Sequence, residues 1–257
     1  MAATTSAKRR TRIIDYPTSD GRPMAETPVH RDVLMDSITT LQNRYEEDPN
    51  VYVSGNMLMY YVPGNKRKHV SPDVFVVFGI PKKPERDYYL VWEEKSPDVV
   101  IEATSKSTFR EDIKKKELYR LVLKVKEYFL FDPKAEYLDP RLQGFRLANG
   151  LYRPIKMVDG RLPSKQLGLH LEADGASLRF FDPATLSYLL TPKERAVQGE
   201  QRAEQEKQRA EQEKQRAEQE KQRAEQEKQR AEREKQRADR LAAELEHMRQ
   251  ELARQKQ

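Results

Sequence analysis

The chain has 257 residues, a formal net charge of +6 and no cysteine. Its length suits one domain plus an additional segment, and the lack of cysteine excludes disulfides and thiolate zinc sites. The sequence has no run of about 18 apolar residues that would span a membrane, and no apolar N-terminal stretch typical of a secretory signal. We therefore expect a cytoplasmic protein without a membrane partner, whose mild positive charge is compatible with binding nucleic acid.

The first part of the chain changes from a polar arm to a folded domain. Residues 1–27 are polar and include several basic side chains, and we expect this arm to be disordered. Apolar residues then recur with helical spacing between residues 29 and 45, which predicts a helix. Apolar runs at 51–53 and 57–62 indicate strands, and the turn PGNKRK follows the second run.

The centre of the chain contains the strongest structural signals. Residues 72–78 and 97–104 are nearly uniform apolar runs that predict buried strands, and a helix is expected from residue 108 or 112 to residue 125. A further buried strand follows at 127–131, and later Asn-Gly and Asp-Gly turns indicate antiparallel hairpins. This order predicts one mixed α/β domain over residues 28–192, with a strand–helix–strand crossover in its middle.

The last part of the chain repeats the heptad QRAEQEK, which is made of strong helix formers. Acidic and basic side chains lie three and four residues apart, and each such pair stabilises a helix by about 0.2–0.5 kcal/mol. A coiled coil needs two apolar seam positions per heptad, whereas here one is Ala and the other is Glu. For residues 193–257 we expect either a single charged helix or a weak coiled coil. An apolar seam appears only at the tip, where it would support a homodimer, at Leu241, Leu245, Met248 and Leu252.

Familiar catalytic motifs are missing from the sequence. It has no glycine-rich loop before a helix, no GxSxG and no HExxH. The four histidines are too scattered to suggest a zinc cluster, so we interpret them as surface or structural residues. His30 is kept as an alternative site residue because it opens the first predicted helix.

Two acidic residues interrupt the strongest predicted strands. Asp73 stands at the start of SPDVFVVF, and Glu102 lies inside SPDVVIEATS, too deep in the strand for a role in a turn. Burying an ionised carboxylate without a partner is unfavourable, and oxygen ligands suit Mg²⁺ or Mn²⁺. The two acids therefore predict a hard-cation site, with turn capping as the alternative for Asp73 and the preferred interpretation of Asp98.

The helix after the second strand begins with three consecutive lysines. Lys116 lies on one helical stripe with Asp112 and Tyr119, which would direct it inward, while Lys114 lies on a stripe with Leu118. Helical periodicity does not choose between these lysines. A solvent-exposed lysine run remains the alternative.

Together these blocks resemble the Uma family of restriction-endonuclease-like proteins, which belongs to the PD-(D/E)XK nuclease superfamily. Three segments within residues 28–190 carry the similarity, in order: SPDVFVVFGIP, PDVVIEATSKSTFREDIKKKELY and VKEYFLFDP. The resemblance implies a restriction-endonuclease-like core sheet with flanking helices. It also implies an Mg²⁺- or Mn²⁺-dependent endonuclease that hydrolyses phosphodiester bonds in DNA.

The resemblance assigns roles to individual residues. Asp73 and Glu102 become metal-binding acids, and the backbone carbonyl of Ala103 becomes a further ligand. The superfamily lysine stands two residues after the second acid, where this chain has Thr104.

The family pattern supplies this lysine from the next helix instead. Lys116, four residues after Asp112, fits that pattern best, with Lys106 and Lys114 as alternatives. It would orient the attacking water or stabilise the transition state. The broken triplet also supports a second hypothesis, a nuclease fold without activity that acts as a binding or scaffold protein and multimerises through its C-terminal helix.

Overall fold

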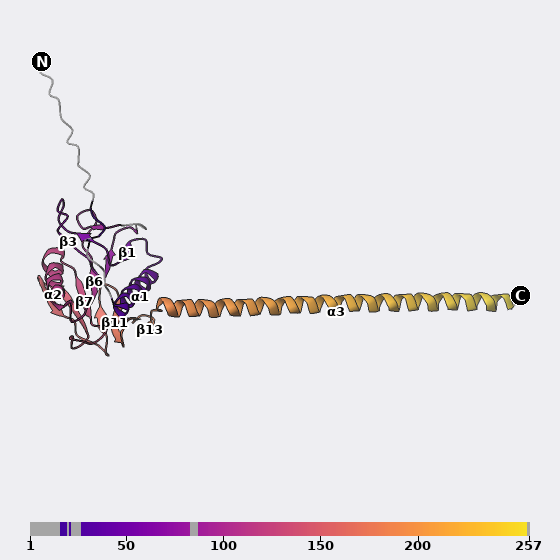
Figure 1. Cartoon of the computed structure of the whole chain (residues 1–257). Coiled ribbons are helices and arrows are strands. Elements are labelled where there is room, and N and C mark those ends of the chain that lie inside the picture. Colours follow the sequence, from indigo (N-terminus) through magenta and orange to yellow (C-terminus); the bar gives the residue numbers. More distant parts are fainter. Residues whose placement is uncertain (1–15, 20, 22–26, 83–86, 256–257) are drawn as a thin grey trace, which may run out of the picture. The chain divides into compact units, whose positions relative to one another are not determined.

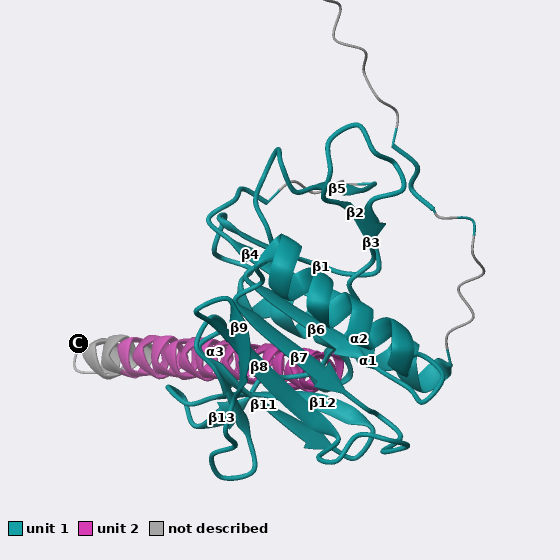
Figure 2. Cartoon of the chain, turned by 90° about the vertical axis from the view of Figure 1, so that its left-hand side faces the viewer, with its two compact units in different colours: residues 1–194 teal, residues 195–257 magenta. Residues whose placement is uncertain are grey.

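The computed structural model describes residues 16–19, 21, 27–82 and 87–255. Most of the arm expected to be disordered therefore lies outside the described residues. The chain divides into two compact units, residues 1–194 and 195–257 (Figure 2). In the described part of the chain, no helix is both long enough and apolar enough to cross a membrane.

The first unit is built around a six-stranded sheet with the order β1-β4-β6-β7-β8-β9. β6 and β7 pair in parallel, and the other neighbouring strands of this sheet pair antiparallel. The chain crosses from β6 to β7 through α2 (Phe109–Leu118) and the π-helical turn η1 (Tyr119–Leu123). The strands are β1 (Val51–Ser54), β4 (Val74–Phe78), β6 (Val99–Ala103), β7 (Glu127–Phe131), β8 (Leu142–Ala148) and β9 (Leu151–Pro154).

One face of this sheet is covered by α1 (Pro28–Arg44) and by a four-stranded sheet. Thr27 caps α1, because its hydroxyl accepts a hydrogen bond from the His30 N–H, and Pro28 occupies the first turn. Leu34 and Leu41 of α1 belong to the same buried cluster as Ile101 of β6. The four strands of the smaller sheet are β10 (Leu162–Ser164), β11 (Leu169–Asp174), β12 (Ser177–Asp182) and β13 (Ser187–Tyr188).

The opposite face is covered by α2, η1 and a three-stranded sheet. Figure 1 shows α1 and α2 on opposite sides of the β6–β7 pair. Tyr119 and Leu123 pack in one buried cluster with Val100 and Tyr128 of the central sheet. The three short strands are β2 (Met59–Tyr60), β3 (His69–Val70) and β5 (Tyr89–Leu90). This layered arrangement confirms the expected mixed α/β fold with flanking helices.

The register between β4 and β6 determines where the two acids lie. Val74 pairs with Ile101, and this pairing is antiparallel. Asp73 comes one residue before that pair and Glu102 one residue after its partner, so both acids lie at this end of the two strands. Glu102 points to the face covered by α2, where it contacts Lys115 and Tyr119, whereas Asp73, in the bend before β4, lies 3.4 Å from His30 of α1.

The second unit consists of residues 195–257. The helix α3 (Pro192–Gln255) begins three residues earlier and forms nearly all of this unit. Its long continuous helix confirms the helix expected from the heptad repeat. Leu241, Leu245 and Met248 are 52%, 55% and 50% exposed within it.

Candidate active site

Glu102 is a fully buried carboxyl group with a partner on each oxygen. It is 1% exposed. Its Oε1 accepts a hydrogen bond from the Tyr119 hydroxyl at 2.5 Å, and its Oε2 accepts one from the Lys115 ammonium at 2.8 Å. Burial raises the pKa of Glu102 to about 8, opposed by Lys115 and reinforced by Asp73. Glu102 therefore holds a proton more strongly than an exposed carboxyl group does.

Lys115 connects α2 to the central sheet. Besides Glu102, its ammonium donates to the backbone carbonyl of Ser71 at 3.1 Å. Burial would lower the pKa of Lys115, but Glu102 and Asp73 raise it above its ordinary value. The ammonium therefore stays charged at neutral pH, next to the two acids.

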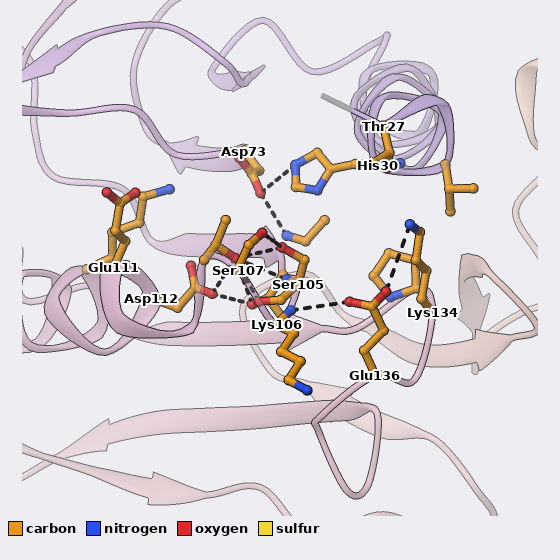
Figure 3. A pocket seen from close by; sticks show the side chains of 16 residues that line it. Thr27, His30, Asp73, Ser105, Lys106, Ser107, Glu111, Asp112, Lys134 and Glu136 are labelled. Atoms are coloured by element: carbon orange, nitrogen blue, oxygen red, sulfur yellow. Dashed lines mark hydrogen bonds and ion pairs between the residues drawn. The ribbon is translucent and has the colours of Figure 1, made fainter. Parts of the chain in front are cut away.

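Asp73, the second acid, lies at the N-terminal end of β4. Its Oδ2 accepts a hydrogen bond from the Ala103 N–H at 2.8 Å and lies 3.4 Å from His30 Nε2. Figure 3 shows the His30 ring directed at this carboxylate from the first turn of α1. The side chains of His30 and Asp73 are 19% and 14% exposed, so both are partly accessible to solvent.

A pocket of about 580 Å³ opens beside Asp73 (Figure 3). Five parts of the chain form its wall: the start of α1, the residue before β4, the end of β6 with the loop after it, α2 and the loop after β7. Glu102 is outside this wall, whereas Lys115, its partner, belongs to it. The wall includes His30, Asp73, Ala103, Thr104, Lys106, Asp112, Lys115, Lys134 and Glu136.

Thr104 occupies the position where the superfamily pattern has its lysine. It is 2% exposed, and its hydroxyl forms hydrogen bonds with Asp112 and with the Tyr137 hydroxyl. Thr108 also donates to Asp112, at 3.0 Å. Burial raises the pKa of Asp112, while the Thr104 and Thr108 hydroxyls oppose that change. Residue 104 thus holds the start of α2 against the end of β6.

The structure corrects the expected position of the site lysine. Lys116, predicted to point toward the acids, instead has its ammonium 3.2 Å from the centre of the Phe145 ring, and burial lowers its pKa. Lys115 takes the place beside Glu102. Three consecutive lysines allowed either assignment, because residues three and four positions before Tyr119 both share its side of a helix. Lys115 lies on a stripe with Glu111 and Tyr119 at four-residue spacing, but Lys116 lies on an equivalent stripe with Asp112 and Tyr119, so only the packing of the helix distinguishes them.

The other sequence candidates lie farther from Glu102 or face elsewhere. Lys106 lines the pocket, and its backbone N–H donates to Glu136 at 3.4 Å. Lys114 is exposed and lines a second pocket on the other side of α2. Asp98, interpreted as a turn cap, is 1% exposed and accepts hydrogen bonds from Lys95 and from the Phe78 N–H, which makes it a structural residue.

The donors at the site are few but chemically uniform. Within the described residues, no group of three or more His, Asp and Glu side chains is placed to hold a metal ion. Asp73 and Glu102 supply carboxylate oxygens, and Ala103 contributes backbone to the same pocket wall. Such oxygen donors fit a hard cation, with water completing its coordination.

The amino-acid sequence of the chain matches a known family. The model of the Uma2 family, described as "Putative restriction endonuclease", matches residues 8–177. The chain belongs to the Uma2 family. This membership supports a nuclease function, and with it a nucleic-acid substrate.

A solved structure is also similar to this Uma2 chain. It is described as a "putative nuclease belonging to DUF820" from Anabaena variabilis ATCC 29413. The two chains share 17% sequence identity with a TM-score of 0.44, over 59% of this chain and 81% of the other. No curated protein matches the chain.

Proposed function

We propose that this protein is an Mg²⁺- or Mn²⁺-dependent endonuclease that hydrolyses phosphodiester bonds in DNA. The observation that carries this proposal is the convergence of Asp73, Glu102 and Lys115 where β4 and β6 meet α2. Two carboxyl groups near one ammonium form an arrangement suited to phosphodiester chemistry. Family membership points to the same class of reaction.

The residues present fit a divalent cation. Asp73, Glu102 and the backbone carbonyl of Ala103 would hold it. Burial and the neighbouring Asp73 disfavour the ionised form of Glu102, and a dication held by these groups would favour it. A bound ion supplies a water of lowered pKa and offsets charge on the phosphate.

The chain's own side chains prepare the site for that substrate. Lys115 keeps its charge and lines the pocket, so its ammonium is available to stabilise negative charge on the reacting phosphate. Tyr119 and Lys115 together fix the orientation of the Glu102 carboxyl group. His30 and the Ala103 N–H do the same for Asp73.

Plasmid nicking by the purified full-length protein tests this proposal. Cleavage should require Mg²⁺ or Mn²⁺, stop with EDTA, and fall at least about 100-fold in Glu102→Gln and in Asp73→Asn. Asparagine is chosen because its side-chain oxygen still accepts the Ala103 N–H bond. Glu117→Gln, an exposed acid on α2 that pairs with Arg120, is the matched control and should cleave normally.

Two outcomes would contradict this assignment. Cleavage that persists in both acid variants would place the reaction elsewhere. A pure wild-type protein that cleaves neither DNA nor RNA with any divalent metal would support the second hypothesis, a nuclease fold that binds without cutting. The buried position of Glu102 behind the pocket wall is the observation that favours that alternative.

A further inference from the structure

A second pocket adjoins the candidate active site on the other side of Lys115. Its volume is about 770 Å³, and it lies between α2 and the hairpin formed by β2 and β3. In Figure 1, β3 lies above α2. Glu111 and Lys115 line both pockets, so the two hollows meet along one stripe of α2.

Basic groups dominate the wall of this second pocket. Arg67 and His69 come from the hairpin, and Lys114 and Lys115 come from α2, whereas Glu111 is the one acid among the lining residues. Lys115 is already paired with Glu102. Arg67 and Lys114 are exposed, and neither forms an ion pair with any described residue.

The wall also contains an aromatic ring. Tyr61 directly follows β2 in the segment that connects it to β3, and it is partly exposed. His69, which pairs with Tyr60 across the hairpin, is held by a contact between its Nδ1 and the Lys66 carbonyl at 3.0 Å. Cationic side chains that bind phosphates, combined with an aromatic face that stacks on a base, are typical of nucleic-acid grooves.

We propose that the pocket between the β2–β3 hairpin and α2 binds backbone phosphates of the nucleic-acid strand on one side of the cleaved bond. This inference rests on the proposed nuclease function and adds to it the route of the substrate. Arg67 and Lys114 would each contact one backbone phosphate. Lys115 would lie between these phosphates and the phosphate that reacts. The strand then passes from the hairpin, across the stripe of α2, into the pocket beside Asp73.

Binding in EDTA separates substrate contacts from cleavage. Fluorescence anisotropy with labelled DNA oligonucleotides would compare wild-type protein with the double variant Arg67→Ala/Lys114→Ala. Loss of two phosphate contacts should weaken affinity about tenfold and reduce the slope of log affinity against log salt by about 1.8. Both side chains are exposed, so folding should be unaffected.

The matched control removes the same charge elsewhere. Arg153 and Lys156 are exposed and lie outside both pockets. Arg153→Ala/Lys156→Ala should change affinity by less than about twofold. The inference is overturned when the groove variant binds like wild type, or when the control loses as much affinity.

Asp73→Asn, measured in parallel, distinguishes this inference from the proposed function. It should bind DNA in EDTA at least as tightly as wild type and fail to cleave it with metal. If wild type never cleaves but the groove variant loses affinity, the nuclease proposal fails and the groove stands as a nucleic-acid site. If wild type cleaves and the groove variant binds normally, the groove inference alone fails.

Discussion

Lys115 donates its ammonium hydrogen bond to Glu102 at 2.8 Å, and this contact fixes α2 to the buried centre of the sheet. The Tyr119 hydroxyl, one helical turn later, bonds the other oxygen of the same carboxyl group. Glu102 is thus held in one orientation by two side chains of a single segment. The segment that carries the Lys115 ammonium therefore also orients the Glu102 carboxyl group.

Replacing Lys115 should abolish cleavage, whereas replacing its neighbour should not. We expect Lys115→Met to cleave at least about 100-fold more slowly, because the charge nearest the acids is removed. Lys116→Met removes an identical charge one residue away and loses only the contact with Phe145, which costs about 0.5–1 kcal/mol of stability. Nicking rates and thermal unfolding of both variants check this.

The reverse result would restore the assignment expected from the sequence. If Lys116→Met is inactive while Lys115→Met retains normal cleavage, the lysine on Phe145 must move to the site in the complex. Circular dichroism of each variant shows whether a loss of activity reflects a loss of folding.

The buried position of Glu102 in its strand could be predicted from sequence, and the lysine beside it could not, for different physical reasons. A strand has a side-chain period of two, so an acid in an apolar run stands out whatever surrounds it. In a run of three lysines on a helix, neighbouring residues point about 100° apart, and only packing decides which one faces inward. Here Tyr119 and Leu123 pack against the sheet within or beside a π-helical turn, a feature that composition does not reveal.

Contacts between distant parts of the chain could not be predicted from the sequence either. His30 reaches Asp73 because the first turn of α1 lies beside the N-terminal end of β4. Thr104 contacts Tyr137, more than thirty residues later. Both depend on how the layers pack, whereas the central strand–helix–strand crossover and the helical tail could be predicted from local patterns.

Gly55 is a position where any side chain would disturb the site. A Cβ atom there would lie 2.0 Å from the backbone oxygen of Asp73 and 2.8 Å from Ile38 Cδ1. Gly55→Ala should therefore displace Asp73, lower the free energy of unfolding by about 1–3 kcal/mol and slow cleavage of the folded fraction. Gly199→Ala, where a Cβ meets no atom within 4 Å, is the control and should leave cleavage unchanged. Unaltered stability and activity in Gly55→Ala would show that this turn shifts freely.

Asp98 should make folding stability depend on acid pH. Burial would raise its pKa, but hydrogen bonds from Lys126, the Phe78 N–H and Lys95 lower it below the ordinary value of 3.8. A carboxyl group whose pKa is lower in the folded state stabilises that state above the unfolded pKa, and this stabilisation is lost as pH falls through the folded pKa. Asp98→Asn should thus be less stable than wild type by about 2 kcal/mol at neutral pH.

Urea unfolding at several pH values tests the sign of this effect. The difference between wild type and Asp98→Asn should be constant near neutrality and shrink below about pH 4, as wild-type Asp98 becomes protonated. Asp32→Asn, at an exposed acid on α1, should show no such difference. A gap between wild type and Asp98→Asn that widens toward acid pH would contradict the role of these hydrogen bonds.

The apolar tip of α3 should join two copies of the chain. Leu241, Leu245 and Met248 are spaced four and three residues apart and are about half exposed, as required for a seam that a second copy covers. Sedimentation of the wild type should show concentration-dependent dimers, and Leu241→Lys/Leu245→Lys should remain monomeric while keeping its helix, because lysine is a good helix former. Gln219→Lys/Gln226→Lys adds the same charge within the repeat and should still dimerise, since the repeat has no continuous apolar seam to disrupt. A wild type that is monomeric at all concentrations would mean that charge along the repeat outweighs the few apolar contacts at its end.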